Sequence, residues 1–181
     1  MKIFVYEHIT GGGMLDDPQV AALAPEGAMM LRALVDDLTA VPGVEVTVLR
    51  DARLPADLPA TIHWVGKADA FWPIFRRAAG EADAVWPIAP EQDGILAGIT
   101  REAIRCNRTL LGCRPDAVDI AASKRATAHV LGHGGIPVIP VYADENSVPP
   151  EANEIVVKPD DGAGCQDTRL FKDRAELRKW L

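Results

Sequence analysis

A chain of 181 residues can bury a sizeable core, and its 48% hydrophobic and 25% charged residues are ordinary for a globular protein. The formal net charge of -7 argues against sequence-independent nucleic-acid binding, which needs a basic surface, and no apolar run approaches the roughly 20 residues that span a bilayer. No signal peptide precedes the first predicted strand, and the three cysteines lack C-x-x-C spacing. These features indicate a cytoplasmic protein with reduced thiols, without a disulfide framework or a zinc site.

Strands and helices are predicted to alternate through the first 114 residues. Residues 2–6 form a short apolar run typical of a strand buried on both faces, and Pro25 suits the first turn of a helix that should end before Pro42. The same periodicities predict strands at 44–49, 61–65, 84–88 and 109–112, and helices at about 69–80 and 91–105. This alternation predicts a parallel sheet covered by helices and joined by right-handed crossovers.

The pattern changes near Arg114. The elements expected after it are helices at about 116–121 and 123–132, an edge strand or connector at 136–141, strands at 155–157 and 167–171, and a helix from 173. We therefore predict an α/β domain at residues 1–114, followed by a smaller α+β part at residues 115–181 that is expected to be incomplete.

The strand at 155–157 delivers Lys158 into a loop that contains Gly162, Ala163 and Gly164. Such a loop can turn backbone N–H groups toward an anion, and the lysine adds a mobile positive charge. The lysine precedes the glycines, so this is not a Walker A loop. The two aspartates of the loop would repel a phosphate unless they point outward or face magnesium, and an ordinary hairpin turn is the alternative. The loop predicts a phosphate site.

Polar residues follow two of the predicted strands. Glu7 and His8 end the first strand, and Glu91 and Asp93 follow the strand at 84–88. Open parallel sheets bind ligands at the carboxyl ends of their strands, so these acidic groups would suit a cationic amine. The alternatives are that Glu91 and Asp93 only favour the positive end of the helix they open, and that His8 is simply hydrogen-bonded instead of acting as a base.

The run Gly11-Gly12-Gly13 follows the first strand but does not complete a G-x-G-x-x-G fingerprint. This disfavours a nicotinamide-dependent oxidoreductase and predicts a flexible loop, with Gly12 beside the substrate crevice. His129 and His133 lie one helical turn apart without a third ligand, so no metal site is predicted. No catalytic residue can be assigned, and Cys165 has no neighbouring base in sequence.

Three stretches of the second half, in this order, resemble the ATP-grasp ligase superfamily. They are Leu110–Thr127, which places Lys124 at a helix start, His133–Pro140, and Val157–Pro159 with the glycine loop that follows. The first half is similar to the pre-ATP-grasp domain that precedes the grasp. Its segments 2–13 and 88–96 are most similar to the tyramine–glutamate ligases of a cofactor pathway.

The resemblance implies an ATP-dependent carboxylate–amine ligase that forms an amide through an acyl phosphate. Lys158 and Lys124 would contact the nucleotide from opposite walls, with Gly162, Ala163 and Gly164 as a flap. ATP, Mg²⁺ and small carboxylate and amine substrates are implied. The magnesium ligands are expected in a second subdomain beyond Leu181, so the chain alone is expected to be inactive.

The alternative function is a non-catalytic nucleotide- or amine-binding module made of half a grasp clamp. In either case an incomplete clamp would expose apolar surface and favour a homo-oligomer.

Overall fold

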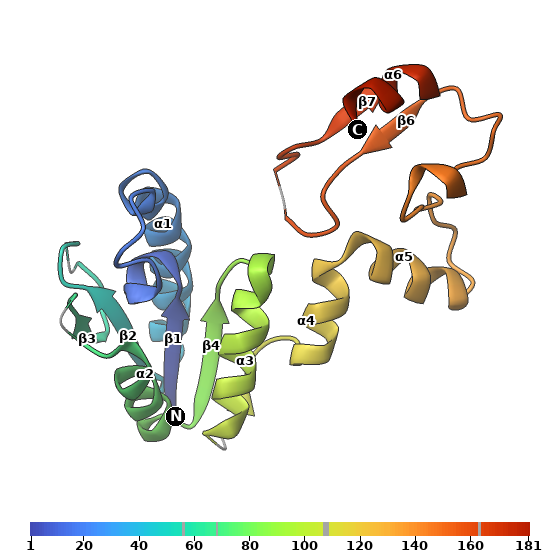
Figure 1. Cartoon of the computed structure of the whole chain (residues 1–181). Helices are drawn as coiled ribbons and strands as arrows, with labels where there is room; N and C mark the ends of the chain where they lie inside the picture. Colours follow the sequence, from blue (N-terminus) through green and yellow to red (C-terminus); the bar gives the residue numbers. More distant parts are fainter. Residues whose placement is uncertain (56, 68, 107–108, 163) are drawn as a thin grey trace. The chain divides into compact units, whose positions relative to one another are not determined.

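The computed structural model describes residues 1–55, 57–67, 69–106, 109–162 and 164–181 (Figure 1). It divides into two compact units. The first consists of Met1–Pro90 and Ile95–Pro115, and the second of Glu91–Gly94 and Asp116–Leu181. The short segment Glu91–Gly94 thus belongs to the second unit, although it lies within the sequence of the first.

The first unit is a five-stranded sheet in the order β3-β2-β1-β4-β5, with every neighbouring pair parallel. The predicted class, a helix-covered parallel α/β fold, is confirmed. Its strands are β1 (Lys2–Glu7), β2 (Glu45–Asp51), β3 (Thr61–Val65), β4 (Ala84–Ile88) and β5 (Thr109–Leu110). Its helices are α1 (Val20–Thr39), α2 (Phe71–Glu81) and α3 (Ile95–Arg105), preceded by a π-helical turn at Ile9–Gly13.

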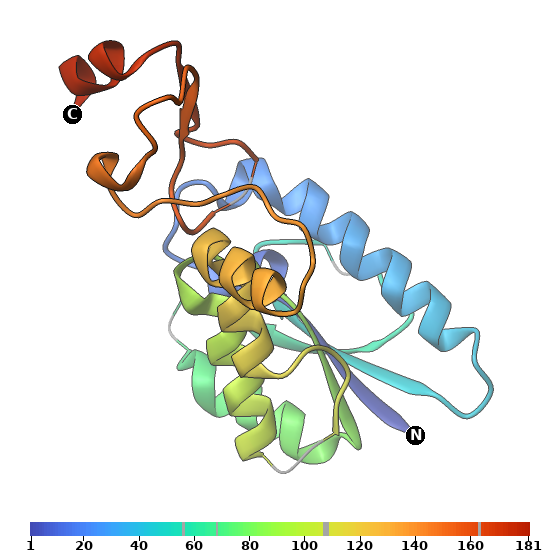
Figure 2. The ribbon, with the colours of Figure 1, turned by 90° about the vertical axis from the view of Figure 1, so that its right-hand side faces the viewer.

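Helices cover both faces of this sheet because β1 sends successive apolar side chains to opposite sides. Ile3 and Val5 pack with Leu31 and Val35 of α1 on one face. Phe4 and Tyr6 pack with residues of α2 and α3 on the other. Figure 2 shows α1 on one side of the sheet and α2 and α3 on the opposite side.

Two helices of the first unit differ from the sequence prediction at their starts. Helix α1 begins at Val20, five residues before the predicted start, because Val20 and Ala24 are buried and extend its packed face past Pro25. Helix α3 begins at Ile95 instead of 91, since Asp93 and Gly94 adopt the left-handed conformation, with φ of 55° and 68°. A left-handed residue cannot continue a right-handed helix.

The second unit combines three helices with a two-stranded antiparallel sheet. Its elements are α4 (Pro115–Ala122), α5 (Lys124–His133), a short turn at Glu145–Ser147, β6 (Ile155–Val157), β7 (Arg169–Phe171) and α6 (Arg174–Trp180). Residues 136–141 form no helix or strand and are the predicted connector. Ile155, Phe171 and Leu177 make a small buried cluster. No helix in the described part of the chain is long and apolar enough to cross a membrane.

Candidate functional site

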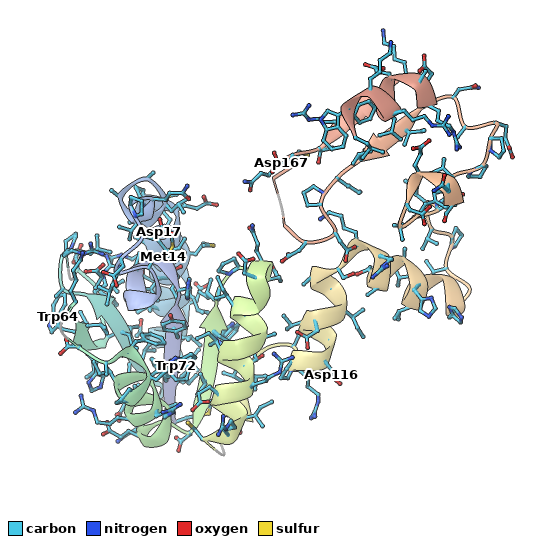
Figure 3. All side chains as sticks on the ribbon, in the orientation of Figure 1. Met14, Asp17, Trp64, Trp72, Asp116 and Asp167 are labelled. Carbon is cyan, nitrogen blue, oxygen red and sulfur yellow. The ribbon has the colours of Figure 1, made fainter. Side chains whose placement is uncertain are left out.

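A cavity of about 250 Å³ lies within the second unit. Its lining comes from Lys124 at the start of α5, from Gln92 and Asp93, and from part of the β6–β7 loop (residues 158–168). The loop residues in the lining are Pro159, Asp161, Gly162 and residues 165–168. Ala163, a predicted nucleotide-binding residue of this loop, lies outside the described residues. Asp167, labelled in Figure 3, contributes to the same lining. We call this space the loop cavity.

Lys124 stands where helix α5 begins. Ser123 caps that helix, with its side-chain oxygen accepting a hydrogen bond from the amide of Ala126, as expected for an N-cap serine. The Lys124 Nζ donates to the carbonyl oxygens of Gly162 at 2.9 Å and Asp160 at 3.2 Å. The ammonium is therefore directed at the β6–β7 loop.

Asp160 turns its carboxylate to the start of α5. Its Oδ2 accepts from the hydroxyl of Ser123 at 2.6 Å, and its Oδ1 accepts from the amide of Arg125 at 2.8 Å. These two bonds, that of Ser123 first, hold the pKa of Asp160 below its usual range. The sequence left open whether the loop aspartates point outward or face a metal, and it did not predict a contact with α5.

The other loop aspartate has a different partner. The Oδ2 of Asp161 accepts from the amide of Asp93 at 2.8 Å, which ties the segment Glu91–Gly94 to the loop. Gly162 and Gly164 adopt φ of 94° and 67°, a conformation that glycine reaches without steric cost. The two glycines thus permit the turn on which these contacts depend.

The predicted nucleotide-binding residues are only partly brought together. Lys124 and Gly162 line the loop cavity, whereas Lys158 and Gly164 are exposed and lie outside its lining. The two lysines were expected on opposite walls, but of the two, Lys124 alone is among the described residues that line the cavity. A role for Lys158 in nucleotide binding stays a prediction.

Glu7 ends β1 and is buried, with only 1% of its surface exposed. Its carboxylate accepts hydrogen bonds from the amides of Ile9 at 2.9 Å and Thr10 at 2.7 Å, and from the Thr10 hydroxyl at 2.6 Å. A Cβ on Gly27 of α1 would lie 2.7 Å from Glu7 Oε2. The carboxylate is thus enclosed between the π-helical turn and α1, and its hydrogen bonds organise that turn.

The triglycine segment is packed within the first unit. Gly12 has φ of 93°, and a Cβ on it would approach the Cβ of Val65 to 2.9 Å. A Cβ on Gly13 would lie 2.2 Å from the Nδ1 of His8. Thr10, Gly11 and Gly12 are buried in a π-helical turn, where a loop was predicted. The missing side chains allow close packing here.

His8 is hydrogen-bonded, which was one of the two roles that the sequence left open for it. Its Nδ1 lies 3.1 Å from the Tyr6 hydroxyl. Burial lowers the pKa of His8, partly opposed by the nearby charge of Glu7, and burial raises the pKa of Tyr6. The imidazole is therefore neutral near pH 7 and has one ring nitrogen engaged with Tyr6.

Arg50 is a buried cation that the sequence reading did not single out. Only 5% of its surface is exposed, and its Nε donates to the carbonyl of Pro55 at 3.0 Å. Among the described residues, its Nη1 has no hydrogen-bond partner. Burial lowers the pKa of Arg50, while Glu7 and Asp51 oppose that shift. In the sequence, the feature that could have identified Arg50 is the charged pair Arg50-Asp51 at the end of an apolar strand.

The predicted amine-binding acids fall in different units. Glu7 and His8 belong to the first, and Glu91 and Asp93 to the second. Their convergence on one crevice therefore stays a prediction. The described residues contain no group of three or more His, Cys, Asp or Glu side chains that could hold a metal ion.

Residues 44–118 match the family model of the pre ATP-grasp 3 domain. The first unit has a pre-ATP-grasp fold. Among curated proteins, no match was found.

Solved structures of related fold are similar to this chain beyond residues 44–118 as well. A protein described as belonging to the ATP-grasp superfamily, from Archaeoglobus fulgidus, is 19% identical over 89% of this chain and 47% of that one, with a TM-score of 0.65. Rhizobium etli pyruvate carboxylase is 15% identical over 98% and 16%, with a TM-score of 0.64. N5-carboxyaminoimidazole ribonucleotide synthetase from Thermotoga maritima is 18% identical over 98% and 42%, with a TM-score of 0.58. The chain spans less than half the length of each of these proteins.

Proposed function

We propose that the protein acts in an ATP-dependent carboxylate–amine ligase reaction, with the loop cavity as its site for the phosphates of ATP. The proposal rests on the loop cavity, which Lys124 lines, in a chain whose first unit has the pre-ATP-grasp fold. Neighbours of the same fold include a ribonucleotide synthetase, which favours ligase chemistry over hydride transfer.

The lining of the loop cavity combines Lys124 with Asp93, Asp161 and Asp167, so we propose that phosphates bind there together with Mg²⁺. Lys124 contributes an ammonium group to the lining at the start of α5, and a cation and a helix N-terminus both favour anions. At about 250 Å³ the cavity is smaller than the roughly 300–1,000 Å³ typical of pockets that enclose a whole ligand. It fits part of a nucleotide, and we assign it to the phosphates.

Bound ATP would supply the phosphoryl group that activates a carboxylate, and an amine would then displace phosphate to form the amide. Mg²⁺ would offset the charge of the phosphates, but no residue of this chain is assigned to it. For the amine we propose the exposed carboxylates of Glu91 and Asp93, since Glu7 is already enclosed by its own turn. Tyramine and glutamate are the substrate pair we would test first.

The test is calorimetric titration of the chain with ATP and Mg²⁺, comparing Lys124→Ala and Lys158→Ala with a control, Lys179→Ala. We expect Lys124→Ala to weaken binding more than tenfold, about 1.4 kcal/mol, because it removes a cation from the lining of the cavity. Lys158 lies outside that lining, so a similar loss in Lys158→Ala would support the sequence prediction that it also contacts the nucleotide. The control removes an exposed lysine from α6 and should leave the affinity unchanged.

Equal affinities for all the variants, or no binding at all, would rule out the loop cavity as the nucleotide site. Binding that depends on Lys124, without amide formation either by this chain or by a longer chain that adds a second grasp subdomain, would favour the non-catalytic nucleotide-binding module.

A further inference from the structure

Four hydrogen-bond donors at the start of α5 are all taken by the β6–β7 loop. The Ser123 hydroxyl and the Arg125 amide donate to the carboxylate of Asp160. The Lys124 amide donates to the backbone oxygen of Asp160 at 3.0 Å, and the Lys124 ammonium donates to that oxygen and to Gly162. A helix start with a free ammonium and hydroxyl is the set of groups that binds phosphate oxygens.

We propose that Asp160 is a built-in competitor for the phosphates of the nucleotide, holding the start of α5 with its carboxylate and backbone oxygen until ATP displaces it. The inference rests on the proposed function, because it concerns the helix start from which Lys124 reaches the lining of the loop cavity. Asp160 places a negative charge and three acceptor oxygen positions against these donors, as a phosphate group would.

The competition has a thermodynamic consequence. While Asp160 occupies the donors, only the fraction of molecules with a released loop can bind phosphates, and the apparent affinity is reduced by that fraction. Asp160 is exposed, so solvent and salt weaken its contacts with the start of α5. The state in which Asp160 occupies these donors is therefore only modestly favoured over the state in which the loop is released. An exchangeable contact of this kind would keep the site ordered without ligand and still allow nucleotide to enter.

The neighbouring aspartate supplies a matched control. Asp161 carries the same charge in the same loop, but its carboxylate accepts from the amides of Asp93 and Gly162, and no bond joins it to α5 among the described residues. A general effect of removing negative charge near the phosphates should appear in both Asp160→Ala and Asp161→Ala. Competition for the start of α5 should appear only in the first.

The experiment measures the Kd for ATP with Mg²⁺, and for tripolyphosphate, in the wild-type chain and in Asp160→Ala, Asp160→Asn and Asp161→Ala. We expect Asp160→Ala to lower both Kd values at least about threefold, and by more than Asp161→Ala, which removes a carboxylate from the cavity lining without freeing the start of α5. Asp160→Asn keeps an acceptor for the Arg125 amide and should fall between. Without nucleotide, the Arg125 amide should exchange its hydrogen faster in Asp160→Ala, and nucleotide should restore its protection.

An unchanged or raised Kd in both Asp160 variants would overturn the competition and show that Asp160 supports the bound state or plays no part in it. Equal tightening in the Asp160 and Asp161 variants would also overturn it, in favour of a simple charge effect. If wild-type and variant chains all fail to bind either ligand, the proposed nucleotide site itself fails, and the competition fails with it.

Discussion

Each of the two units of this protein is stabilised by a different kind of contact. The first buries large side chains completely on both faces of its sheet, with Phe4, Tyr6 and Phe75 at 0% exposure. The second has a small buried cluster, and its α5 buries none of its described residues, while Val130 is 47% and Ile139 is 85% exposed. Much of what orders the second unit is polar, such as the loop aspartates and Arg174, which donates to three backbone carbonyls.

This contrast separates a rigid support from an adaptable binding region. Elements with few buried apolar contacts open at low free energy, and binding loops are drawn from such regions. We therefore expect the second unit to lose its structure before the first when the protein is heated or exposed to denaturant.

The largest expected effect is in the core of the first unit. Phe75→Ala should lower the free energy of unfolding by about 3–5 kcal/mol, because it removes a ring packed against Phe4, Tyr6, Phe71 and Trp72. Urea denaturation followed by circular dichroism would measure it. Phe171→Ala, which truncates a ring in the small cluster, should leave the unfolding of the first unit unchanged. A similar loss from both substitutions would show that the units unfold as one.

A smaller loss is expected at Glu7. Glu7→Ala leaves the buried amide of Thr10 and the part-buried amide of Ile9 without their acceptor and should cost about 2 kcal/mol or more. Glu45→Ala, at the exposed start of β2, is the matched control and should change stability by less than about 0.5 kcal/mol. If thermal denaturation gives the two variants the same midpoint, the carboxylate does not organise the turn.

The smallest effect concerns pH. The pKa of His8 is lowered by burial, so below the usual imidazole pKa of about 6.5 the unfolded chain binds a proton that the folded chain does not. Stability should therefore fall as the pH is reduced from about 7 through that range. In His8→Asn this contribution should be absent. Midpoints of thermal unfolding at pH 7.5 and 5.5 would show it, and an unaltered pH dependence in the variant would contradict it.

Much of the first unit was predictable because its strands are buried on both faces and appear in the sequence as apolar runs. The strands at 61–65 and 84–88 were predicted with the bounds that they have. The start of α1 was not, since burial of Val20 outweighed the usual place of Pro25 in a first turn. The packed turn at the triglycine segment was not predicted either. Glycine permits both mobility and close packing, and the residues around it in the fold decide between them.

At the candidate site, the sequence identified the loop and Lys124 but not the contact between them. Ser123 and Asp160 lie 37 positions apart, and no local pattern shows that a loop aspartate reaches a distant helix start. Arg50 was missed because its burial depends on how the segment after β2 folds back over it, with Pro55 accepting its hydrogen bond.

The close approach of helix α1 to the carboxylate of Glu7 limits how these positions can evolve. Any side chain at residue 27 would displace the Glu7 carboxylate, since even a Cβ would lie 2.7 Å from its oxygen. A shorter acid at residue 7 would in turn leave space over Gly27. The two positions, 20 apart in sequence, should therefore vary together among homologues, and an exchange at one alone should be rare.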